Sequence, residues 1–195
     1  MLFEKFGTKT TDTPPAAADE IVIVNPAAEI QDISLPIAPR LGSLRGARVG
    51  IVDNAKRMAL PLLKALESIL QAEYGVASFN YYRKENASIP MPKDAMDAMA
   101  KASDAVVHGV ADCGSCVTWG LYDSVEFEKL GVPAVNVITT GFSAAAKVRA
   151  RTLGMQDHPI VAVQHPLANR TTPEVEDFAK QIVHQVTSGL LHNHQ

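Results

Sequence analysis

The sequence has few cysteines, no long apolar run and no block of basic charge. Its 195 residues include only 2 cysteines, too few for a scaffold built on disulfides. The apolar runs are much shorter than the ~20 residues that a membrane-spanning helix needs, so no membrane partner is expected. The 18 lysines and arginines are scattered and the net charge is −3, so no nucleic-acid partner is expected.

Signals for export and for nucleotide binding are also missing. Residues 1–13 contain no apolar stretch typical of a secretory signal, so we expect the protein to be cytoplasmic. No predicted strand leads into a glycine-rich or lysine-containing phosphate loop, so nucleotide binding is not expected. Hydrophobic residues make up 47% and charged residues 20%, which is typical of a globular protein rather than a disordered one.

Composition divides the chain into three parts. Residues 1–20 lack periodicity and are rich in Thr, Pro and Ala, which predicts a flexible tail. We expect that tail to be mobile in a monomer or ordered only across the interface of a homo-oligomer. Residues 21–45 contain one short apolar run and several prolines, which predicts an extended lead-in. Residues 46–191 form the predicted α/β domain.

Short apolar runs alternate with helical patterns through this third part. The runs predict strands at residues 49–53, 76–81, 105–110, 134–138 and 160–163. Helical spacing between them predicts the helices, and Thr171 with Glu174 predicts a capping box at the start of the last one. The alternation predicts a single α/β domain. We expect a doubly wound, mainly parallel sheet of about five strands with helices on both faces, similar to Rossmann and flavodoxin folds.

In such a sheet, ligands bind outside the carboxyl ends of the strands. Polar side chains follow four of the predicted strands, and one aromatic residue begins the next helix. We expect them to gather around one site: Asn54, Lys56, Asp112, Cys113, Thr139, Thr140, Phe142 and His165. The cysteine pair therefore reaches the edge where the fold predicts chemistry.

The segment Cys113-Gly114-Ser115-Cys116 lies at the expected start of a helix. Unpaired N–H groups and the helix dipole there favour a thiolate over a thiol. Cysteines three residues apart can form a disulfide, with Cys113 as the more exposed attacker and Cys116 as the resolving cysteine. Gly114 would let a substrate approach the backbone, and Ser115 could donate a hydrogen bond to an anionic intermediate.

Other residues allow several interpretations. Asp112 fits a base or a helix cap, and His165 fits a metal ligand, an acid/base or a structural residue. A metal at the cysteine pair is not excluded, although no second cysteine pair supports it and no cofactor is expected. His108 lies inside a strand and is expected to be a core histidine. The charges at residues 126, 128 and 129 are expected to form a solvated helix face.

Six blocks of residues carry a resemblance to a known family. They are GVADCGSC at 109–116, DSVEFE at 123–128, GVPA at 131–134, VDNAK at 52–56, ARTLGM at 150–155 and HPL at 165–167. Together they cover about residues 40–168 and resemble the UGSC-motif family, with a more distant likeness to the selenoprotein B subunits of glycine and betaine reductases. Some members of the family carry selenocysteine at the first motif position, which corresponds to Cys113. The resemblance therefore implies nucleophilic or redox chemistry at Cys113.

Three functions remain open on this basis. The first is a thiol-dependent redox enzyme acting on a small electrophilic or disulfide substrate, restored by an external thiol reductant. The second is a cysteine hydrolase or lyase with a covalent Cys113 adduct, in which Asp112 or His165 moves protons. The third is a metal-binding or non-catalytic subunit of a reductase-like complex, which predicts either a bound metal or an obligate partner chain.

Overall fold

The structure is a computed structural model, and it describes residues 34–192 of the chain. The predicted tail at residues 1–20 and the first part of the predicted lead-in lie outside the described residues. The elements alternate as the sequence predicts. In chain order they are β1 (Arg48–Asp53), α1 (Ala59–Tyr74), β2 (Ser78–Arg83), α2 (Lys93–Ala102), β3 (Ala105–Ala111), α3 (Gly114–Lys129), β4 (Ala134–Thr139), the 3-10 turn η1 (Thr140–Phe142), α4 (Ser143–Thr152), β5 (Ile160–Val163) and α5 (Thr172–Leu190).

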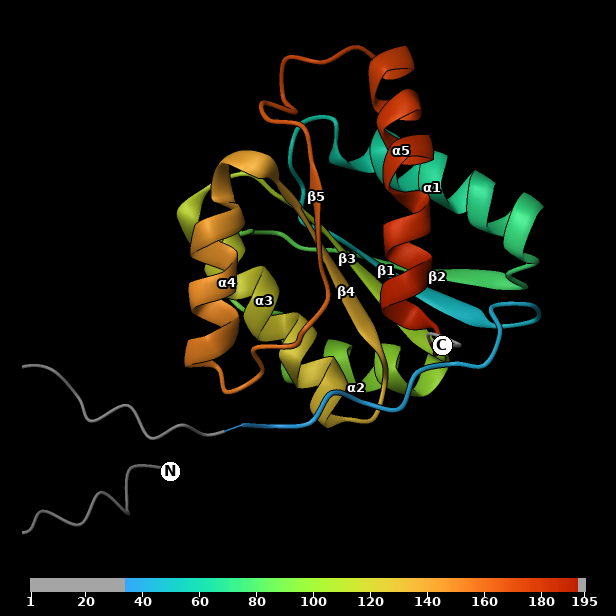
Figure 1. Ribbon diagram of the computed structural model, residues 1–195, viewed down its shortest axis with the longest axis vertical. Coiled ribbons are helices and arrows are strands. Elements are labelled where there is room, and N and C mark those ends of the chain that lie inside the picture. The colour runs from blue at the N-terminus through green and yellow to red at the C-terminus, as the bar shows by residue number, and fades with distance from the viewer. Residues whose placement is uncertain (1–33, 193–195) are drawn as a thin grey trace, which may run out of the picture. The chain divides into compact units, whose positions relative to one another are not determined.

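The five strands form one parallel sheet in the order β2-β1-β3-β4-β5. Helices α1 and α5 cover one face, and α2, α3 and α4 cover the other (Figure 1). The predicted doubly wound α/β fold is confirmed. Its strand order reverses direction between β1 and β3, so the connections that leave these two strands lead to opposite faces of the sheet.

Burial explains why the central strands β3 and β4 consist mostly of apolar residues. Every residue of β3 and β4 is buried, because helices cover both faces of the sheet there. The edge strand β2 is only partly buried and begins two residues later than its apolar pattern predicted. The capping box of α5 is present, with the Glu174 carboxylate accepting a hydrogen bond of 2.8 Å from the N–H of Thr171.

The lead-in crosses the sheet's end next to β4 and α5. The N–H of Leu41 donates to the carbonyl of Leu190, and the N–H of His192 donates to the carbonyl of Leu41. The N–H of Ala38 donates to the carboxylate of Glu128 at 2.6 Å. The last part of the lead-in is thus bound to the same unit as the sheet, while the division of the chain at residue 45 stays a prediction. Within residues 34–192, no helix is long and apolar enough to cross a membrane.

The expected solvated face on α3 is wrong for Glu128. Its side chain is buried and accepts hydrogen bonds from Arg40, Ala38 and Ala134. Position 128 lies on the same side of α3 as the buried Leu121, Ser124 and Val125, so this face is turned toward the sheet. The charge of Glu128 alone could not reveal its burial, because its partner Arg40 lies 88 residues earlier in the chain.

Candidate functional site

The cysteine pair lies where the strand order reverses. Cys113 follows β3 directly and Lys56 follows β1, the two strands on either side of the reversal. In open α/β sheets this point forms a crevice, since neighbouring connections diverge to opposite faces. The topology therefore brings residues from two distant segments to one place.

Cys113 and Cys116 are joined by a disulfide across the first turn of α3, with their Cα atoms 5.3 Å apart. Cys113 is the extended residue that precedes the helix, and it is partly exposed. Cys116 is completely buried against α3 and β4 side chains. Of the two sulfurs, only that of Cys113 can therefore be reached from solvent.

Lys56 contacts this sulfur directly. Its ammonium nitrogen lies 3.7 Å from Cys113 Sγ and 3.6 Å from the carboxylate of Asp112. A tight turn holds Lys56 there: Ala55 has a left-handed φ of 55°, and its N–H donates to the Asp53 carboxylate at 2.8 Å. A left-handed conformation is uncommon for alanine, so the surrounding structure must compensate for its cost.

Two hydroxyl groups form the other side of the Cys113 environment. Ser115 Oγ lies 3.5 Å from Cys113 Sγ, and Ser88 Oγ lies 2.9 Å from Ser115 Oγ. Sequence reasoning missed Ser88, which comes from the loop between β2 and α2 and carries no motif that points to a site. Gly114 is exposed, and a Cβ added there would meet no atom within 4 Å. The backbone next to Cys113 is therefore open to a ligand.

Asn54 lies beneath the site rather than in its opening. It is buried, its N–H donates to the carbonyl of Gly109, and its amide nitrogen donates to the carbonyl of Val110 at 3.4 Å. Its Oδ1 has no hydrogen-bond partner among the described residues. Asn54 thus ties β1 to β3, and a direct role in substrate binding stays a prediction.

The remaining predicted residues form a second group at the ends of β4 and β5. Thr139 Oγ1 lies 3.0 Å from Nδ1 of His165, and the N–H of His165 donates to the hydroxyl of Thr140. The ring of Phe142 meets the imidazole edge to face, with centroids 5.8 Å apart. Among residues 34–192, no hydrogen bond joins this group to Cys113. Both Phe142 and Cys113 nevertheless pack against the same apolar cluster under α3 and α4.

A buried ionic cluster lies deeper, around Asp123 of α3. Its carboxylate contacts Lys84 Nζ at 2.5 Å and His108 Nε2 at 3.3 Å, and accepts from the N–H of Met91. Burial alone would raise the pKa of Asp123, but the contacts with His108 and Lys84 hold it below its usual range. Burial lowers the pKa of His108, so a neutral imidazole donates to Asp123. His108 is a core histidine as predicted, although its Nδ1 has no partner among the described residues.

The cysteine pair also belongs to a group with metal-ligand chemistry. One donor atom from each of Asp112, Cys113 and Cys116 lies within 4.8 Å of the others. A metal could use both sulfurs only after the disulfide is reduced. The ammonium of Lys56 beside Asp112 and Cys113 opposes a cation there. His108 is bonded to Asp123 instead, so a metal at the pair stays an alternative that the geometry does not favour.

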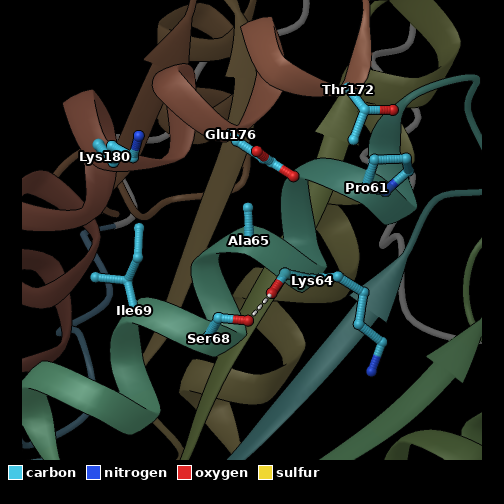
Figure 2. A pocket seen from close by; sticks show the side chains of 8 residues that line it. All are labelled: Pro61, Lys64, Ala65, Ser68, Ile69, Thr172, Glu176 and Lys180. Atoms are coloured by element: carbon cyan, nitrogen blue, oxygen red, sulfur yellow. Dashed lines mark hydrogen bonds between the residues drawn. The ribbon is translucent and has the colours of Figure 1, made fainter.

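A separate groove of about 390 Å³ lies between α1 and α5, on the other face of the sheet (Figure 2). Two of its polar side chains, Lys64 and Ser68, already have partners. The Ser68 hydroxyl donates to the carbonyl of Lys64, and the Lys64 ammonium contacts Glu67 and the ring of Tyr81. No cysteine or histidine lines it, so the surroundings of Cys113 stay the candidate site.

Comparison with known proteins gives one family match. The model of the UGSC family matches residues 22–192, and no curated protein matches the chain. Among solved structures, the chain is similar to the FMN-dependent cysteine decarboxylase SpaF, with 13% identity, 71% of this chain and 97% of that chain covered, and a TM-score of 0.38. It is also similar to a short-chain dehydrogenase/reductase from Veillonella parvula in complex with NADP, with 10% identity, coverage of 72% and 65%, and a TM-score of 0.33. Both scores are too low to support an argument about function. The likeness to selenoprotein B subunits is not confirmed.

Proposed function

Since the chain belongs to the UGSC family, and Cys113 by resemblance corresponds to the first position of the family's motif, we propose that it is a thiol-dependent redox enzyme. Cys113 is the attacking thiolate and Cys116 is the resolving cysteine. The substrate is a small disulfide or another small electrophile, and an external thiol restores the enzyme. This chemistry takes place at the edge of the sheet where β1 and β3 end.

The unequal burial of two bonded sulfurs is the observation that carries the proposal. Cys113 is partly exposed, whereas Cys116 is buried and bonded to it. A substrate can therefore reach only Cys113, and Cys116 can attack only the Cys113 sulfur. This is the division of roles that a dithiol enzyme needs.

The electron balance for a disulfide substrate is complete. The Cys113 thiolate attacks one substrate sulfur, which forms a mixed disulfide and releases the other half as a thiolate. The Cys116 thiolate then attacks Cys113 Sγ, which releases the second half and leaves the Cys113–Cys116 disulfide. The substrate gains two electrons, and two external thiols return two electrons to the enzyme as they are oxidised.

The neighbouring residues supply charge and protons in this scheme. The Lys56 ammonium, 3.7 Å from Cys113 Sγ, and the N-terminus of α3 both favour the thiolate. Asp112 orients Lys56 through their ion pair. His165, whose Nδ1 is bonded to Thr139, is the proposed proton donor to a leaving thiolate. Asn54, Gly114, Ser115, Thr139, Thr140 and Phe142 are the proposed substrate contacts.

Trapping the mixed disulfide tests the proposal. Reduced full-length protein is mixed with oxidised glutathione, and its intact mass is followed with time. The wild type should pass through a glutathione adduct and end two hydrogen masses lighter than the reduced protein. Cys116→Ser should stop at the adduct on Cys113, and Cys113→Ser should form an adduct far more slowly, because its remaining thiol is buried.

Each contrary result selects another function. A Cys116→Ser variant that forms no stable adduct would contradict the role of Cys116 as the resolving cysteine. Adducts on Cys113 only with acyl or other non-redox electrophiles would indicate the hydrolase or lyase alternative. A wild type in which neither cysteine reacts would indicate a non-catalytic subunit.

A further inference from the structure

The loop between β2 and α2 places a serine over the start of α3. Ser88 Oγ lies 2.9 Å from Ser115 Oγ, which lies 3.5 Å from Cys113 Sγ. Both serines are exposed, and Cys113 is partly exposed. A chain of two hydroxyl groups therefore leads from this loop to the reactive sulfur.

The direction of these hydrogen bonds follows from the proton count. The Cys113 sulfur in the disulfide carries no proton, so the Ser115 hydroxyl must be the donor to it. Ser115 has only one hydroxyl proton, so Ser88 must donate to the oxygen of Ser115. A hydroxyl that accepts a hydrogen bond is polarised and becomes a stronger donor itself. Ser88 thus strengthens the donor that faces Cys113 Sγ.

Ser88 is fixed in place by contacts that return to the cysteine helix. Its N–H donates to the side-chain oxygen of Asn86 at 2.8 Å. Both ends of the loop are bound by the buried carboxylate of Asp123, through Lys84 Nζ at 2.5 Å and the N–H of Met91 at 2.8 Å. Asp123 lies two helical turns after Cys116 on α3. The loop and the cysteines are therefore anchored to the same helix.

We infer that Ser88 is a positioning residue for Cys113: it orients and polarises the Ser115 hydroxyl, which stabilises negative charge on the Cys113 sulfur. The inference rests on the proposed role of Cys113 as the attacking thiolate. The charge develops twice in that scheme, on the attacking sulfur and again on the same sulfur when the enzyme's disulfide is reduced. The loop from Lys84 to Pro92, which no motif marks, becomes part of the redox site.

The pH dependence of alkylation at Cys113 tests this role. Reduced full-length protein is treated with iodoacetamide between pH 5 and pH 9, and modification of the Cys113 peptide is followed by mass spectrometry. Ser115→Ala should shift the midpoint upward by about half a pH unit, which lowers the rate about threefold below the midpoint. Ser88→Ala should shift it in the same direction by a smaller amount, and Ser88→Thr should keep the wild-type midpoint because it retains the hydroxyl.

A double variant tests whether Ser88 acts on Cys113 through Ser115 or independently of it. In a Ser115→Ala background, Ser88→Ala should cause no further shift, because its only route to Cys113 has been removed. Ser68→Ala is the matched control: it also removes an exposed hydroxyl, but on α1 at the other face of the sheet, and should leave the midpoint unchanged.

Two results would overturn the inference. One is a Ser88→Ala midpoint equal to that of the wild type. The other is that Ser88→Ala shifts the midpoint by the same amount in the wild-type and Ser115→Ala backgrounds. Neither depends on catalytic turnover. A protein that alkylates as expected but traps no mixed disulfide would contradict the proposed function and leave the hydroxyl relay in place.

Discussion

The ammonium of Lys56 lies 3.7 Å from the sulfur of Cys113, although 57 residues separate them in the chain. The same ammonium pairs with Asp112 at 3.6 Å, and its side chain is only about a quarter exposed. Water therefore screens this charge less than it would on an open surface. The contact joins the connection after β1 to the connection after β3.

Replacing Lys56 by methionine should slow alkylation of reduced Cys113. Losing a positive charge about 4 Å from the sulfur should lower the rate at pH 7 roughly three- to tenfold, after allowance for partial solvent screening. The rate of iodoacetamide labelling at the Cys113 peptide measures this. Lys129→Met is the control, because Lys129 lies at the other end of α3 from Cys113, and this variant should match the wild type. Equal rates for Lys56→Met and wild type would show that the ammonium does not act on the sulfur.

Breaking the buried pair of Lys84 and Asp123 should cost much of the protein's stability. Asp123→Asn leaves a buried ammonium without a counter-charge, and we expect a loss of roughly 3–5 kcal/mol in the free energy of unfolding. Unfolding in urea followed by circular dichroism measures the loss. The double variant Lys84→Met with Asp123→Leu removes both charges and should lose less than the single variant. A single variant that is as stable as the wild type would contradict the burial of this charge pair.

Glu128 and Glu126 allow a comparison within one helix. Glu128→Gln leaves the mostly buried guanidinium of Arg40 unpaired, so a loss of about 3 kcal/mol or more in unfolding free energy is expected. Glu126→Gln breaks only an ion pair with the partly exposed Lys129 and should cost less than about 1 kcal/mol. Urea unfolding of both variants decides whether α3 is held by Glu128. Equal losses would mean that position 128 is as solvated as its charge suggested.

His158 should make the protein less stable as the pH falls below 6.5. Burial and the nearby charge of Arg40 lower its pKa to about 3, and the Glu128 carboxylate 3.7 Å away is already neutralised by Arg40. The unfolded chain takes up a proton near pH 6.5, whereas the folded protein does not. The contribution of His158 to the free energy of unfolding is therefore fully present above pH 6.5. Below that pH it is lost at about 1.4 kcal/mol for each pH unit.

Urea unfolding at pH 7 and pH 5 measures this dependence. His158→Gln should reduce the difference between the two pH values, although buried His108 adds a loss in the same direction. His184→Gln, on the exposed side of α5, is the control and should keep the wild-type difference. An unchanged difference in His158→Gln would show that His158 is not held neutral in the folded protein.

Local pattern was enough to predict much of this molecule. The alternation of apolar runs and helical stripes predicted all five strands, the helices between them and the capping box of Thr171 and Glu174. Residues just after a strand must lie at its carboxyl end, so Cys113 was predicted at that edge of the sheet from its place in the chain. Such predictions succeed because periodicity and strand direction are properties of neighbouring residues.

Only the tertiary structure decided which distant residues meet. The sequence predicted Lys56 and Cys113 at the same edge of the sheet, but their direct contact depends on the strand order, which puts β1 beside β3. Burial turns Glu128 from an apparent surface charge into the partner of Arg40, and the loop after β2 brings Ser88 to Ser115. The two residues of each pair are 27 to 88 positions apart in the chain. Periodicity within a single segment does not encode them, because they depend on how whole elements pack against one another.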